Sequence, residues 1–60
     1  MTGEQVREGR RGRGWTQERL ASALGVSVAT VQSWEQGRRG VPQMAERLMR
    51  RLGLRWTLDT

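Results

Sequence analysis

Residues 16–37 decide the fold, and they read Thr-Gln-Glu-Arg-Leu-Ala-Ser-Ala-Leu-Gly-Val-Ser-Val-Ala-Thr-Val-Gln-Ser-Trp-Glu-Gln-Gly. Thr16 and Ser27 are residue types that cap helix N-termini, and Gly25 is the type that ends a helix in a left-handed conformation. The stretch therefore predicts two short helices joined by a tight turn. The exposed face of the second helix carries short, uncharged side chains, which is typical of a helix that enters the major groove of DNA.

Helical patterns also flank this stretch on both sides. A capping box that begins at Thr2 predicts a first helix over residues 3–11, although Gly9 weakens the interior of that helix. Pro42 suits the first turn of a fourth helix, and Gly53 ends it. The sequence is therefore predicted to be all-α, a compact domain of four to five helices.

The C-terminal tail, residues 54–60, alternates apolar and polar side chains. Leu54, Trp56 and Leu58 fall on one side of this period-two pattern, which allows a short C-terminal strand. Two interpretations of the tail stay open: these residues contact a second copy or another protein, or they fold back over the monomer core. In either case we expect residues 1–60 to form a single domain.

Composition limits the classes of function. The chain carries 11 basic residues, all of them arginine, against 6 acidic ones, and its formal net charge of +5 favours a polyanionic partner. It contains no cysteine and no histidine, which removes thiolate metal sites and the commonest general base. We therefore expect no enzyme, no cofactor and no metal site. No apolar run is long enough for a membrane span or a signal core, which predicts a cytoplasmic protein without a membrane partner.

The central stretch resembles the Cro/C1-type (XRE) helix-turn-helix family of phage repressors and bacterial regulators. The residues that carry the resemblance are Trp15-Thr16-Gln17-Glu18, Leu20-Ala21, Leu24-Gly25-Val26-Ser27, Val31, Trp34-Glu35-Gln36-Gly37-Arg38 and Pro42. The resemblance implies a lambda-repressor-like domain with its helix-turn-helix at residues 16–37. It also implies a homodimer that binds a palindromic site on double-stranded DNA and regulates transcription, with repression as the expected outcome.

The resemblance also implies roles for individual residues. Gln17 matches the glutamine that holds a DNA phosphate and braces the recognition helix, and Arg10 and Glu35 match a salt bridge between the first and third helices. Trp15 and Trp34 are expected in the core. Base edges would be faced by Ser27, Val28, Ala29, Gln32 and Ser33, and the DNA backbone by Thr30, Gln36, Arg38 and Arg39.

Two departures from the family pattern carry expectations of their own. Gly9 stands where the family usually has a core leucine, which predicts a loosely packed first helix. Val28 and Ala29 replace long polar readers, so they can contact thymine methyl groups but cannot form bidentate hydrogen bonds with a base. Gln32 is then the residue best suited to read a base directly, and that base is adenine. The remaining sequence specificity is either modest or depends on DNA shape.

Two alternatives use the same chain differently. An antitoxin or adaptor module would have another protein as its main partner, bound through the apolar residues of the tail. Single-stranded nucleic acid or RNA could instead bind the arginine-glycine run at residues 9–14. That run is short, lacks interleaved aromatic residues and falls at a helix junction, so duplex DNA is favoured.

Overall fold

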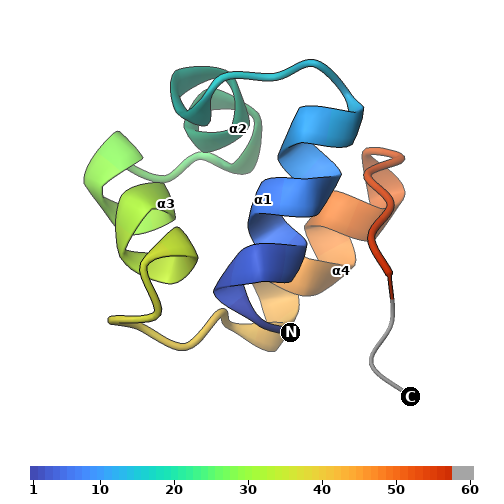
Figure 1. Cartoon of the computed structure of the whole chain (residues 1–60). Helices are drawn as coiled ribbons and strands as arrows, with labels where there is room; N and C mark the ends of the chain where they lie inside the picture. Colours follow the sequence, from blue (N-terminus) through green and yellow to red (C-terminus); the bar gives the residue numbers. More distant parts are fainter. Residues whose placement is uncertain (58–60) are drawn as a thin grey trace.

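The computed structural model describes residues 1–57 and contains four helices. They are α1 (Gly3–Gly12), α2 (Gln17–Leu24), α3 (Val28–Glu35) and α4 (Gln43–Arg51). In Figure 1, α2 and α3 follow one another on one side of the molecule, and α1 and α4 lie on the other. The all-α fold with a central helix-turn-helix is the one that the sequence predicts. Within the described part of the chain, no helix is long and apolar enough to cross a bilayer.

The N-termini of the helices are set by local hydrogen bonds. Thr2 Oγ1 accepts a hydrogen bond from the backbone N–H of Gln5, and Gln5 Oε1 accepts one from the N–H of Thr2, which completes the predicted capping box. Thr16 and Ser27 each accept from the backbone N–H three residues further on. Pro42, expected inside the first turn of α4, is instead its N-cap residue and makes no side-chain cap.

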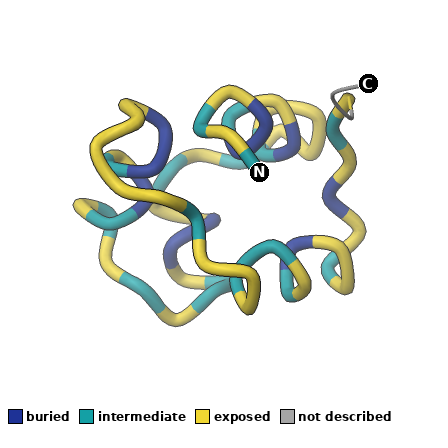
Figure 2. The backbone as a smooth tube through the Cα atoms, turned by 90° about the horizontal axis from the view of Figure 1, so that it is seen from below, coloured by how far each residue is buried: buried dark blue, intermediate teal, exposed yellow. Residues whose placement is uncertain are grey.

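The core draws apolar side chains from all four helices and from the tail. Figure 2 shows buried positions distributed along the backbone rather than confined to one segment. Trp34 is 3% exposed and belongs to this core, as the sequence predicts. The buried apolar residues are Val6, Leu20, Ala21, Val31, Trp34, Met49 and Leu54.

The described part of the tail folds back on α1 and forms no strand. Leu54 is buried, with 3% of its surface exposed. The side-chain Nε2 of Gln5 donates to the backbone oxygen of Thr57 at 3.0 Å, and the backbone N–H of Thr57 donates to Glu8 Oε2 at 2.7 Å. These two bonds pair the tail with a helix instead of a strand. Over residues 54–57 the tail therefore packs on the core and α1 of its own chain.

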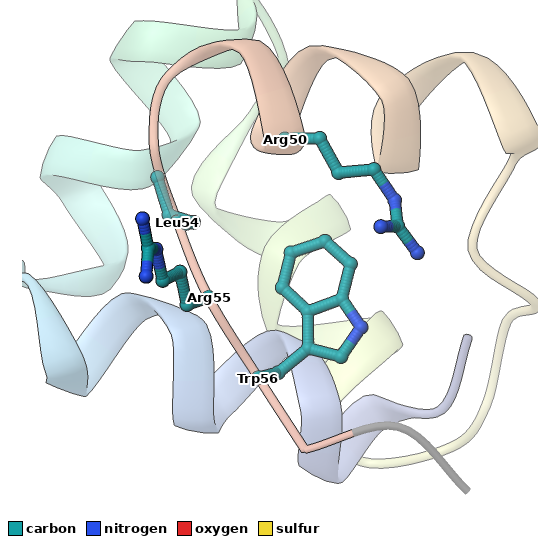
Figure 3. A pocket seen from close by; sticks show the side chains of 4 residues that line it. All are labelled: Arg50, Leu54, Arg55 and Trp56. Carbon is teal, nitrogen blue, oxygen red and sulfur yellow. The ribbon is translucent and has the colours of Figure 1, made fainter.

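Gly9 is buried because the tail packs directly on it, so the predicted loose packing of the first helix is wrong. A Cβ at this position would lie 3.2 Å from Cε3 of Trp56 and 3.5 Å from Cβ of Leu54. These side chains fill the space that a leucine would otherwise take. Figure 3 shows Trp56 beneath the side chain of Arg50, whose guanidinium lies 5.1 Å from the ring centroid. Leu58, the third apolar residue of the tail, lies outside the described residues.

Candidate nucleic-acid interface

The turn between α2 and α3 fixes how the second helix is presented. Gly25 has φ of 73° and ψ of 30°, a left-handed conformation that residues with a Cβ rarely adopt. The N–H of Val26 donates to the backbone oxygen of Ala21 at 3.0 Å, and that of Gly25 donates to Ser22 at 3.3 Å. This pair of bonds is a Schellman motif, and it ends α2 so sharply that only three residues separate it from α3.

The structure brings the predicted base-facing residues together on the outer side of α3. The opposite side of the helix is fixed in the core by Val31, which is fully buried, and by Trp34. No residue between 27 and 33 is charged. Ser27, Ala29 and Gln32 are exposed, while Val28, Thr30 and Ser33 are half-buried.

Two hydroxyl groups at the start of α3 are bonded to each other. Ser27 Oγ lies 2.9 Å from Thr30 Oγ1, and it also accepts the backbone N–H of Thr30 at 3.2 Å. Thr30 is predicted to face the DNA backbone and Ser27 a base edge. Ser27 Oγ already caps α3, and Thr30 Oγ1 is bonded to that oxygen.

The Gln17 amide connects α2 to two positions on α3. Its Nε2 donates to Glu35 Oε1 at 3.2 Å, and its Oε1 accepts from Gln32 Nε2 at 3.3 Å. Because an ionised carboxylate only accepts hydrogen bonds, the NH₂ group of Gln17 must face Glu35 and its oxygen must face Gln32. Gln17 therefore occupies a bracing position against the recognition helix.

Glu35 anchors the other end of this network in the protein interior. Its side chain is 1% exposed and accepts from Arg10 Nε at 2.8 Å and from Arg10 Nη2 at 3.1 Å. Arg10 and Glu35 thus form the ion pair between α1 and α3 that the resemblance implies, and its geometry is bidentate. Arg10 Nη1 also donates to the backbone oxygen of Trp15 at 2.9 Å, which fixes the linker that leads into α2.

Arg7 is a further donor to Glu35 that the sequence reasoning missed. Its Nε lies 3.4 Å from Glu35 Oε1, and its side chain is 43% exposed. A signal was present, because Arg7 precedes Arg10 by three residues and the two share one face of α1. The cluster therefore joins Glu35 to two cations rather than one.

The Glu35 carboxyl titrates below its ordinary range. Burial would by itself raise its pKa, but hydrogen bonds from Arg10 and Gln17, the charge of Arg10 and the hydrogen bond from Arg7 together outweigh burial and lower the pKa from 4.5. The carboxylate form is thus the one that the fold stabilises.

The segment after α3 presents cations to solvent. Gly37 has φ of 76°, and the backbone N–H groups of Arg38 and Arg39 both donate to the oxygen of Ser33, at 2.9 and 3.3 Å. Both arginines are exposed, as is Gln36. Among residues 1–57, neither arginine has a carboxylate within salt-bridge distance. Their guanidinium groups therefore lie available to an anion next to the end of α3.

Trp15 lies at the edge of the core rather than within it. It packs against core residues but stays half-buried. The guanidinium carbons of Arg13 and Arg19 lie 5.2 and 5.4 Å from its ring centroid. Trp15 thus packs against the core, as expected, but is only partly buried, and two cations lie over its ring.

A hollow beside the tail offers a second place where arginines gather. It has a volume of about 200 Å³ and is lined by Arg50, Leu54, Arg55 and Trp56. Figure 3 shows the guanidinium groups of Arg50 and Arg55 pointing away from one another. They do not converge on one ligand, so α3 and the segment after it remain the candidate interface.

Two helices joined by a left-handed glycine turn, with the second helix braced from behind and exposed in front, define a helix-turn-helix protein. Residues 3–57 match the helix-turn-helix domain family, and the chain belongs to that family. Comparisons with curated proteins and with solved structures gave no significant match. Family membership supports DNA as the partner of this chain.

Proposed function

We propose that this chain is a Cro/C1-type regulator that binds specific duplex DNA sites in the cytoplasm and represses transcription by occupying them. The observation that carries the proposal is the outer face of α3, which is uncharged from residue 27 to 33 and braced by Gln17 and Glu35. A rigid helix with a neutral surface suits the major groove, which is wide enough to admit an α-helix.

Affinity and choice of site are divided between different residues in this proposal. Gln17, Gln36, Arg38 and Arg39 hold the phosphate backbone, which supplies much of the affinity but reads no sequence. Gln32 hydrogen-bonds to an adenine. Its bond to Gln17 leaves it one N–H and its carbonyl oxygen, the donor and acceptor that adenine N7 and N6 require.

A homodimer completes the proposal, because one α3 covers only one half-site. Two copies related by a two-fold axis would read half-sites about one helical turn, roughly 34 Å, apart. The alternative of an antitoxin or adaptor relied on apolar tail residues as a protein contact. Leu54 is buried and Trp56 packs on Gly9, so both are already engaged within the monomer.

Selection of bound duplexes from a random pool tests the function. The expected result is a palindromic consensus whose half-site spacing matches one turn of DNA. A single-stranded pool of the same sequences serves as competitor. Equal competition by single strands, or no enrichment of any duplex, would contradict the proposal.

Gln32→Ala should reduce discrimination between the selected site and a site with its adenine replaced. The expected loss is about 1–3 kcal/mol of the difference in binding free energy, because one bidentate contact is removed. Gln43→Ala, an exposed glutamine at the start of α4, is the matched control and should leave discrimination unchanged. If Gln32→Ala weakened binding to all duplexes equally, Gln32 would be a backbone contact instead.

Arg38→Ala should lower the salt dependence of DNA binding. The slope of log K against log salt should fall by about one unit, because one phosphate contact releases one counterion fewer. Titrations at several salt concentrations measure the slope, and Arg47→Ala on α4 removes the same charge elsewhere. An unchanged slope for Arg38→Ala would take this residue out of the phosphate contacts.

A further inference from the structure

We infer that the first turn of α3 reads C5-methyl groups in the major groove, those of thymine or of 5-methylcytosine, rather than the hydrogen-bonding pattern of a base pair. The inference rests on the proposed function and specifies what its apolar surface recognises. It would make the methyl group itself the chemical feature that selects the site at these positions.

The two hydroxyl groups of the first turn are bonded to each other. Ser27 Oγ accepts the backbone N–H of Thr30 at 3.2 Å and lies 2.9 Å from Thr30 Oγ1. The two hydroxyls keep one O–H donor and free lone pairs, and a hydroxyl can serve donor and acceptor groups on a base edge alike. The hydroxyls therefore do not distinguish one base pair from another.

The other side chains that this turn presents are aliphatic. Ala29 is exposed, and Val28 is half-buried, with one side against the core and the other in water. Aliphatic carbons neither donate nor accept hydrogen bonds. The only apolar feature on a base edge in the major groove is the C5-methyl group of a pyrimidine.

The long polar side chain of this face does not extend into the first turn. Gln32 lies one helical turn beyond Val28, and Gln17 holds its amide at 3.3 Å. Gln32 is therefore directed to its own base pair. The positions opposite Val28 and Ala29 are left to contact with methyl groups.

This arrangement predicts an unusual equivalence between base pairs. A T·A pair and a 5-methylcytosine·G pair carry the methyl group on the same pyrimidine carbon but differ in the neighbouring donors and acceptors. A surface without a selective polar reader should treat the two pairs alike. It should distinguish each from the corresponding pair that lacks the methyl group, uracil·A or C·G.

The test starts from the duplex selected from a random pool. Each thymine of one half-site is replaced in turn by uracil, by 5-methylcytosine opposite guanine, and by cytosine opposite guanine. Affinities are measured for the four versions at every position. Beneath the first turn, loss of the methyl group should weaken binding about fourfold with either base pair. This factor corresponds to about 0.8 kcal/mol per buried methyl group.

A variant ties the effect to these side chains. Val28→Asn combined with Ala29→Ser replaces the aliphatic groups of the methyl-contacting turn by polar groups of similar size. The ratio between methylated and unmethylated duplexes should fall close to one, with a melting curve showing that the variant is folded. Met44→Ala removes an 82% exposed apolar side chain from α4 and should leave the ratio at its original value.

The outcomes separate this inference from the function on which it rests. The inference is overturned if thymine and uracil bind alike at every position, or if the selected half-site contains no thymine. A strong preference between T·A and 5-methylcytosine·G beneath the first turn would also overturn it, because that preference requires hydrogen-bond readout. Absence of binding to every duplex would instead overturn the proposed function itself.

Discussion

Gly3→Ala is expected to destabilise the domain by about 3 kcal/mol, which corresponds to a fall in Tm of roughly 12–24 °C for a chain of this size. A Cβ on Gly3 would collide with the backbone oxygen of Trp34 and lie 2.9 Å from the backbone oxygen of Glu35. Backbone atoms cannot rotate aside as a side chain can, so α1 would have to move away from α3. Thermal and urea unfolding followed by circular dichroism would measure the loss.

Gly12→Ala is the matched control on the same helix. No atom lies within 4 Å of the Cβ that this substitution would add, and Gly12 does not have a positive φ. The change should stabilise the domain slightly, by at most about 1 kcal/mol, because alanine loses less entropy in a helix. If Gly3→Ala and Gly12→Ala melted at the same temperature, the close approach of α1 to α3 would be wrong.

The helices could be predicted because their signals are local. The caps at Thr16 and Ser27 and the glycine at position 25 each act within a few residues. The apolar spacing of α2 and α3 likewise places Leu20, Val31 and their neighbours on one side of each helix. Such signals determine which face of α3 is exposed, and they do so before any tertiary contact is known.

The roles of two glycines could not be predicted, because both depend on residues far away in the chain. Gly3 follows the N-cap of α1 and reads as an ordinary first-turn residue until the backbone of Trp34 is found against it. Gly9 reads as a missing core leucine until Trp56 is found packed on it. In both cases the decisive neighbour comes from a contact that periodicity does not encode.

The candidate site was predictable at the level of positions but not of hydrogen bonds. Helical spacing places Val28, Ala29 and Gln32 on one exposed surface. It does not say that the hydroxyl of Ser27 bonds that of Thr30, because either could equally have pointed to solvent. The chemistry presented by α3 depends on these side-chain conformations, which sequence spacing leaves free.

Glu35→Leu is expected to cost about 3–5 kcal/mol, since it leaves a buried cation without its counter-charge. The side chain of Arg10 is only 11% exposed and directs two hydrogen bonds to the Glu35 carboxylate. Replacing both residues, as Arg10→Met with Glu35→Leu, removes the charge and should recover much of this loss. A double-mutant cycle in urea measures the coupling. A double variant as unstable as the sum of the two singles would show that the pair does not interact.

Acidic pH should lower the unfolding free energy of the wild-type domain, because it protonates the Glu35 carboxylate. The pKa of Glu35 is lowered from 4.5, so its stabilising effect is complete above that pH and is lost as pH falls through the lower folded-state pKa. Glu35→Gln, which cannot ionise, should therefore flatten the decline in unfolding free energy below about pH 5.

Glu46 provides the comparison that assigns the acid effect. Its pKa is also lowered, first by a hydrogen bond from the amino group of Met1 and then by one from Arg50, but its side chain is 27% exposed. Solvent screens partly exposed ion pairs, so Glu46→Gln should change the pH dependence less than Glu35→Gln does. The reverse order would mean that the terminal ion pair, rather than the cluster that holds α1 against the recognition helix, governs acid stability. Measuring both variants over the same pH range therefore tests whether Glu35 is the main electrostatic support of α3.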